Sequence, residues 1–245
     1  MKTNREQNFN RTGESGNVLI YVLIAVVLFA ALSFTLSRQT DSTEAGALDQ
    51  QRAELYATEL ITYAANAKEA YDKMSFSGTY LEDVDFTLPS DPAFNTAPTI
   101  KKIFHPDGGG LNLAALPEKV GVDTVTDPVP GWYMGRFNNV EWTGADPAGT
   151  DIILTAYGIN PSVCGFINQK ITGDTAIPSI SEPTREVLVP QSVGSVTYFA
   201  GTNQDLTTDP ANTTPAPICP ECHNRSSLCV ENGGIYAFYN VLANR

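Results

Sequence analysis

An uninterrupted apolar stretch near the N-terminus constrains this chain more than any other feature. No side chain from residue 17 to residue 37 carries a charge, and residues 18–32 are apolar apart from the hydroxyl of Tyr21. A helix of that length extends about 30 Å, which matches the hydrocarbon thickness of a bilayer. A helix buried in a protein core is rarely apolar on all faces for so long. The stretch therefore predicts a membrane-spanning helix.

The charges on either side of the stretch indicate how the helix is inserted. Cytoplasmic flanks of membrane helices carry an excess of Lys and Arg. The sequence before the stretch is basic and the sequence after it is acidic, with Lys2, Arg5 and Arg11 on one side and Asp41, Glu44 and Asp49 on the other. This asymmetry predicts a cytoplasmic N-terminus and an exported chain after Arg38.

The sequence that follows favours a helix that continues beyond the membrane. Residues 48–74 contain no proline and place apolar side chains at the i, i+4, i+7 spacing of an amphipathic helix. These side chains are Tyr56, Leu60, Tyr63, Ala67, Ala70, Tyr71 and Met74. We therefore expect one helix over about residues 18–74, apolar on all faces in its first half and on one face in its second half. A cleaved signal peptide and a simple uncleaved anchor are the alternatives.

The remaining sequence, residues 76–245, is typical of a mainly β domain with long loops. Turn-rich segments such as "LPSDPAFNTAP" and "TTDPANTTPAP" separate runs with strand character. We expect strands at Gly131–Trp142, Asp151–Ile159, Gly194–Ala200 and Ile235–Leu242, the first two forming a hairpin, and a short helix in "NPSVCGFINQKI" with Asn160 as its N-cap and Pro161 at its first position. The predicted fold class is α+β, with a long N-terminal helix packed on a mainly antiparallel sheet.

The N-terminal region resembles the type IV prepilins and the pseudopilins of type II secretion. The resemblance is carried by a short polar leader that ends in Gly16, an apolar helix that starts at once, and its amphipathic continuation. It implies that a prepilin peptidase cuts between Gly16 and Asn17 and methylates the new N-terminus. It also implies that the helix takes part in assembly through residues that include Val18, Leu19, Ile20 and Tyr21.

The resemblance divides the chain into a leader (1–16), a membrane or filament-core helix (17–38), its amphipathic continuation (39–75) and an exported domain (76–245). Members of the family usually have Phe or Met directly after the glycine and Glu five residues after it. Here these positions hold Asn17 and Tyr21. Tyr21 cannot replace a carboxylate as the partner of a neighbouring subunit's N-terminal ammonium, although its hydroxyl can accept a hydrogen bond. This departure favours a minor or divergent subunit.

Four cysteines lie in the last third of the chain: Cys164, Cys219, Cys222 and Cys229. An even number of cysteines in an exported domain favours two disulfides, for which three pairings exist. A zinc site made by the three cysteines of "CPECHNRSSLC" with Cys164 or His223, and a redox-active CxxC, are the alternatives. The resemblance to pilin-like proteins implies the pairs Cys164–Cys229 and Cys219–Cys222.

Other features argue against several classes of function. A net charge of −12 disfavours nucleic acid as a partner. The glycines of "FHPDGGGLN" are not followed by the GK[ST] of a phosphate-binding loop, so we expect a flexible or tightly turning loop. His105 and Asp107 beside them lack a third metal ligand. We expect no catalytic residues, no cofactor and no metal site.

Together these features predict a pilin-like structural subunit of a type IV pilus or a type II secretion filament. Its expected location is the bacterial inner membrane, as a single-pass protein whose C-terminal domain is periplasmic, or extracellular in a filament. The expected partners are a prepilin peptidase, other pilin or pseudopilin subunits, the inner-membrane assembly platform and membrane lipid. The alternative is a membrane-anchored periplasmic binding protein that does not polymerise.

Overall fold

The computed structural model describes residues 15–137, 140, 151–189, 206 and 218–244, without the side chains of 15–19, 32 and 34–48. The chain divides into two compact units, one ending at Asp49 and the other running from Gln50 to Arg245. The predicted leader, Trp142 and the predicted strand Gly194–Ala200 lie outside the described residues, except that the leader's last two residues belong to the first helix.

The long N-terminal helix expected from the sequence is present as α1 (Ser15–Phe76). It ends in a Schellman motif, in which Gly78 adopts a left-handed φ of 90°. The amides of Gly78 and Thr79 donate hydrogen bonds of 3.0 Å to the carbonyls of Ser75 and Met74, respectively. Glycine is suited to this position because it has no Cβ to strain the left-handed conformation.

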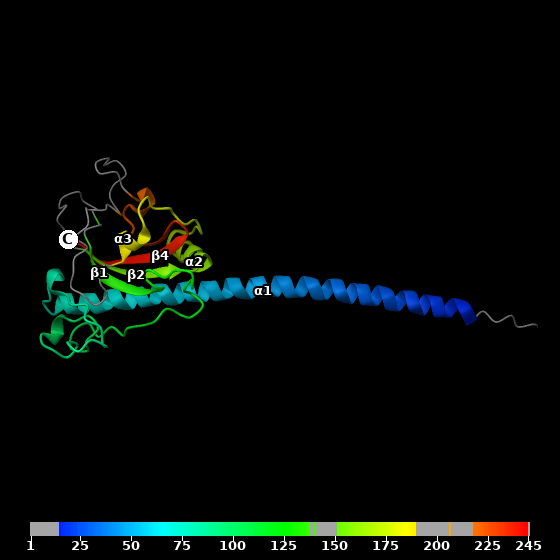
Figure 1. Cartoon of the computed structure of the whole chain (residues 1–245), viewed down its shortest axis with the longest axis horizontal. Helices are drawn as coiled ribbons and strands as arrows, with labels where there is room; N and C mark the ends of the chain where they lie inside the picture. The colour runs from blue at the N-terminus through cyan, green and yellow to red at the C-terminus, as the bar shows by residue number, and fades with distance from the viewer. Residues whose placement is uncertain (1–14, 138–139, 141–150, 190–205, 207–217, 245) are drawn as a thin grey trace, which may run out of the picture. The chain divides into compact units, whose positions relative to one another are not determined.

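The fold is α+β, and the described residues of the second unit form a four-stranded antiparallel sheet (Figure 1). The strand order is β1-β2-β4-β3, with β1 at Gly131–Phe137, β2 at Asp151–Ile159, β4 at Ile235–Ala243 and β3 at Ser227–Asn232. The predicted hairpin of β1 with β2 is confirmed, as is the predicted span of β2. The structure describes β1 as far as Phe137, and the predicted end of this strand at Trp142 lies outside the described residues. Strand β3 was not expected from the sequence.

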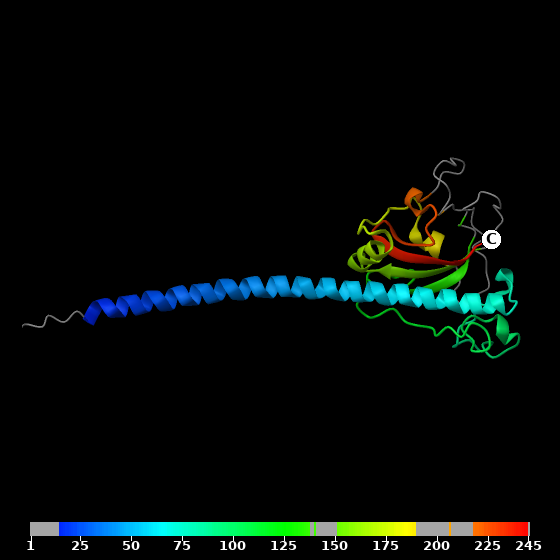
Figure 2. The ribbon, with the colours of Figure 1, turned by 180° about the vertical axis from the view of Figure 1, so that it is seen from behind.

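Both faces of the sheet are covered, as Figures 1 and 2 show from opposite sides. The side chains of Ile152, Leu154 and Ala156 in β2 belong to the same core as the buried side of α1, whereas Ile153 and Tyr157 belong to a second core with α3 (Thr184–Leu188). Successive strand residues point to opposite faces, so covering both faces makes β2 apolar almost throughout.

The buried stripe of α1 contains four of the seven predicted side chains, Leu60, Ala67, Ala70 and Met74, and three alanines that were not predicted. The fully covered side chains repeat at spacings of three and four residues and are mostly alanines: Ala53, Ala57, Leu60, Ala64, Ala67, Ala70 and Met74. The predicted members Tyr56, Tyr63 and Tyr71 are only half-buried, at the edges of this stripe. Alanines allow the helix backbone to approach its neighbours closely, and large tyrosine rings would prevent this.

The predicted short helix is confirmed as α2 (Pro161–Thr172). The Asn160 side chain accepts a hydrogen bond of 2.9 Å from the amide of Ser162, and Pro161 occupies the first helical position. Gly173 ends the helix with a φ of 85°. Three short 3₁₀ turns, η1 (Leu81–Asp83), η2 (Thr99–Lys101) and η3 (Pro220–Cys222), lie in the loops.

Candidate functional site

The first feature with functional potential is the exposed apolar surface of α1 in the first unit. Among the described side chains there, the large apolar ones are 49–76% exposed: Ile20, Tyr21, Val22, Leu23, Ile24, Val26, Val27, Leu28 and Phe29. The predicted processing residues Gly16 and Asn17 and the predicted assembly residues Val18 and Leu19 also lie in α1. We call residues 20–29 the apolar segment.

Across the part of the chain that the structure describes, no helix has the combination of length and apolarity needed to cross a membrane.

The second feature is the pair of disulfides, which confirms the expected pairing. Cys164 in α2 is bonded to Cys229 in β3, with their Cα atoms 5.4 Å apart. Cys219 is bonded to Cys222, with a Cα separation of 5.3 Å. This bond joins the residue before η3 to the last residue of η3. All four sulfurs are therefore engaged, and none of the cysteines is a free thiol. The zinc alternative is wrong for this oxidised chain because zinc binds cysteine as the thiolate.

The buried amide of Asn168 supports the link between α2 and β3. Its Nδ2 donates to the carbonyls of Ala176 and Cys229, and its Oδ1 accepts from the amide of Cys229, each at 2.8 Å. Asn168 is fully buried. The bidentate contact with Asn168 and the disulfide to Cys164 therefore join Cys229 to the same helix, α2.

The glycine-rich loop is confirmed as a tight turn. The amides of Gly108 and Gly110 donate to the carbonyl of His105 at 2.9 Å, and the amide of Gly109 donates to the carbonyl of Lys102 at 3.2 Å. A Cβ on Gly108 would lie 2.2 Å from the Lys102 carbonyl oxygen, so only glycine fits there. Because all three glycine amides are already bonded to carbonyls, they are not free to cradle a phosphate.

His105 and Asp107 contact each other next to this turn. The Asp107 amide donates to His105 Nδ1 at 3.2 Å, and its carboxylate accepts from the Thr99 hydroxyl at 3.0 Å. Among the described residues, no group of three or more His, Cys, Asp or Glu side chains is placed to hold a metal ion.

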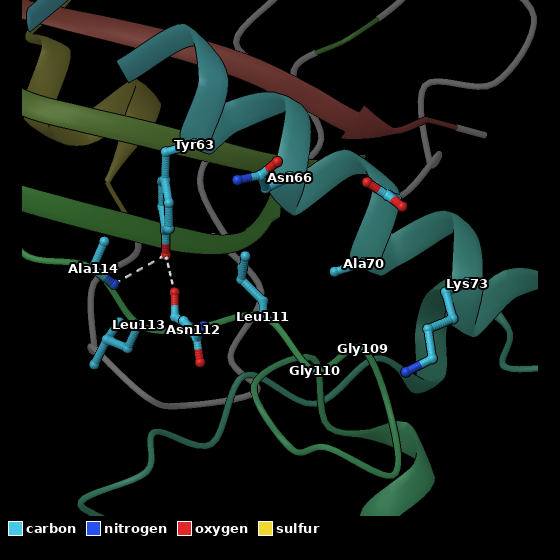
Figure 3. A pocket seen from close by; sticks show the side chains of 11 residues that line it. Tyr63, Asn66, Ala70, Lys73, Gly109, Gly110, Leu111, Asn112, Leu113 and Ala114 are labelled. Atoms are coloured by element: carbon cyan, nitrogen blue, oxygen red, sulfur yellow. Dashed lines mark hydrogen bonds between the residues drawn. The ribbon is translucent and has the colours of Figure 1, made fainter. Parts of the chain in front are cut away.

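The third feature is a groove in the second unit, between α1 and the irregular segment 109–117. It consists of two hollows of about 520 and 440 Å³, which share Tyr63, Asn66 and Ala114. We call the two hollows together the α1 groove. The smaller hollow also includes Leu55 and Trp132, and the larger one includes Lys73 at the turn of α1 nearest the glycine loop (Figure 3).

Tyr63 connects the two walls of the α1 groove. Its hydroxyl donates to the carbonyl of Asn112 at 3.0 Å and accepts from the amide of Ala114 at 3.4 Å (Figure 3). Burial raises the pKa of Tyr63, and the hydrogen bond from Ala114 lowers it by a smaller amount. The Tyr63 ring lies 4.6 Å from the ring of Trp132, centroid to centroid, at an interplanar angle of 45°.

The α1 groove was not expected from the sequence, because Tyr63, segment 109–117 and Trp132 are far apart in the chain. The half-buried tyrosines at the edge of the helical stripe were the only signal that could have indicated it.

Comparison with known proteins adds no relative, since no family model, curated protein or solved structure matches the chain.

Proposed function

We propose that this protein is a pilin-like structural subunit that is processed by a prepilin peptidase and assembles through α1 into a type IV pilus or type II secretion type filament. The observation that carries the proposal is the apolar segment, whose large side chains are 49–76% exposed. Burial of one such side chain stabilises by about 1.5–3 kcal/mol. The segment is therefore strongly favoured to be covered by lipid or by other helices.

In a pilin-like subunit the apolar segment is covered first by lipid and later by other helices. Before assembly, residues 17–38 would hold the protein in the bacterial inner membrane, with the N-terminus in the cytoplasm. During assembly the same side chains would leave lipid and pack against the helices of neighbouring subunits. The second unit, with its two disulfides, is suited to an oxidising periplasm or cell exterior. Tyr21 in place of the usual glutamate favours a minor subunit.

The alternative is a membrane-anchored binding protein that does not polymerise. It accounts for the apolar segment by lipid alone and leaves the N-terminus unprocessed. The state of the N-terminus therefore separates the two proposals.

The test is intact mass and N-terminal sequencing of the protein isolated from its native membrane. We expect an N-terminus at Asn17 that carries an added methyl group. Gly16→Val should block this cleavage, and Gly13→Val, a change at the other glycine of the leader, should leave it intact. An unprocessed Met1 in the wild-type protein would leave only the anchored binding protein. A cut beyond residue 30 would mean a freely exported protein without either function.

A further inference from the structure

We propose that the α1 groove binds a neutral oligosaccharide, with the Tyr63–Trp132 pair as its stacking platform and the side chain of Asn66 as its central hydrogen-bonding group. This proposal does not rest on filament assembly, because every residue that carries it belongs to the second unit.

The aromatic pair provides the apolar half of the chemistry. Pyranose rings present a face of C–H groups that packs on aromatic rings, whose faces carry a partial negative charge. Tyr63 and Trp132 lie side by side at the smaller hollow, and both rings are partly exposed. The Tyr63 hydroxyl is already bonded to Asn112 and Ala114, so this residue offers a fixed ring rather than a free polar group.

The polar half comes from side chains along the outer face of α1. Asn66 lines both hollows, Glu59 lines the smaller one and Glu69 the larger one. Within the described residues, these three side chains make no hydrogen bond or ion pair, so their donors and acceptors are available to sugar hydroxyls. An amide can both donate and accept, which matches a hydroxyl that does the same.

The charges of the α1 groove argue against other classes of ligand. The lining of the α1 groove contains two carboxylates, Glu59 and Glu69, and one ammonium, Lys73. Since the whole chain also has a net charge of −12, phosphates and other anions are disfavoured as ligands. An apolar peptide lying in the groove would bring no polar side chains to these groups and would cover the carboxylates, at a cost in desolvation. The two hollows have volumes within the range typical of ligand sites and adjoin at the shared residues Tyr63, Asn66 and Ala114, so each can take part of one chain of linked sugar units.

The experiment uses the full-length chain in detergent, with Trp142→Phe so that Trp132 is the only tryptophan. The fluorescence of Trp132 is recorded during titration with maltohexaose, cellohexaose and chitohexaose up to about 10 mM, a concentration well above the dissociation constant that we expect for an open groove. An apolar decapeptide of Leu, Val and Ala is the competing probe. The same titrations are made with Asn66→Ala, which removes an exposed side chain without intramolecular bonds, and with Gln51→Ala, an exposed amide of α1 outside the groove.

We expect a saturable response to at least one hexasaccharide, weakened about tenfold or more by Asn66→Ala because one bonding group is lost, and unchanged by Gln51→Ala. No saturable response to any of the three sugars would overturn the proposal. So would a sugar response that Asn66→Ala leaves unchanged, or a decapeptide that binds more tightly than every sugar. An unprocessed N-terminus would leave the sugar result unaffected.

Discussion

At the scale of single residues, Asn168 shows how one side chain can fix the contact between two elements. The Asn168 side chain hydrogen-bonds both the amide and the carbonyl of Cys229, as the backbone of a neighbouring strand would. A buried polar group of this kind is stabilising only while all of its partners are present.

We expect Asn168→Ala to lower the free energy of unfolding by about 3 kcal/mol, since it leaves the buried amide and carbonyl of Cys229 without partners and also removes the hydrogen bond to the carbonyl of Ala176. Urea unfolding followed by circular dichroism measures the change. Gln169→Ala, at the exposed neighbouring position of α2, is the matched control and should change it little. A loss for Asn168→Ala no greater than that of the control would contradict this account.

The buried phenol of Tyr239 makes the stability of the fold depend on pH under alkaline conditions. Its side chain is completely buried and its hydroxyl donates to the carbonyl of Arg225 at 3.2 Å. Burial raises the pKa of Tyr239 far above its usual value, and the nearby charge of Arg225 lowers it by a smaller amount. Below pH about 10 the phenol is neutral in the folded and the unfolded chain. As the pH rises further, only the unfolded chain loses its proton, so stability falls.

Tyr239→Phe should therefore reduce the loss of stability between pH 9 and pH 11, by up to about 1.4 kcal/mol per pH unit above the ordinary tyrosine pKa. Urea midpoints at the two pH values measure this difference. Tyr80→Phe, at an exposed tyrosine, is the control. An equal pH dependence in the Tyr239→Phe variant and the wild type would show that ionisation of Tyr239 does not drive alkaline unfolding.

At the scale of elements, the alanine stripe sets the distance between α1 and the elements packed against it. Ala64 is almost fully buried, whereas the next residue, Ala65, is exposed. We expect Ala64→Leu to lower the free energy of unfolding by about 1–3 kcal/mol, because the added methylenes must push the helix outward. Ala65→Leu adds the same volume on the exposed face and should be nearly neutral. Chemical denaturation of both variants tests the prediction, which fails if the two losses are equal.

The disulfide between α2 and β3 also contributes to the stability of the fold. Cys164 and Cys229 are separated by 65 positions in the chain, and Cys219 and Cys222 by 3. Loop closure in the unfolded chain predicts that replacing both Cys164 and Cys229 by alanine lowers the free energy of unfolding by about 4 kcal/mol. Replacing Cys219 and Cys222 should cost clearly less. Thermal unfolding of the two double variants compares them, and a larger loss for the short loop would refute the loop-closure explanation.

The elements were predictable to different degrees for physical reasons. The apolar run and the helical spacing after it indicated α1, and the capping residues Asn160 and Pro161 indicated α2, because these signals are local in the chain. The strand β3 is short and contains Cys229, so its sequence was interpreted only as part of a cysteine motif. The hairpin turn after it, Gly233–Gly234 with φ values of 59° and 82°, was the signal that could have indicated it. The α1 groove depends on contacts distant in sequence and has no local signal.

At the scale of the whole molecule, the division at Asp49 and Gln50 separates a helical segment from a unit with its own core. The second unit contains both buried clusters and both disulfides. We expect a fragment of residues 50–245, produced in an oxidising compartment, to fold alone with nearly the urea midpoint of the full chain. A fragment that begins at residue 58 loses Ala53 and Ala57 from the stripe and should be less stable. An unfolded 50–245 fragment would contradict the division.

The bond between Cys164 and Cys229 also turns part of the chain into a closed covalent ring, with β4 outside it. A protease that cuts once anywhere inside this ring opens the backbone but releases no fragment. The two pieces remain joined through the disulfide, and the pairing of β3 with β4 need not change. Such a nicked molecule would migrate as a single chain on a gel until a reductant is added, and only then separate into two.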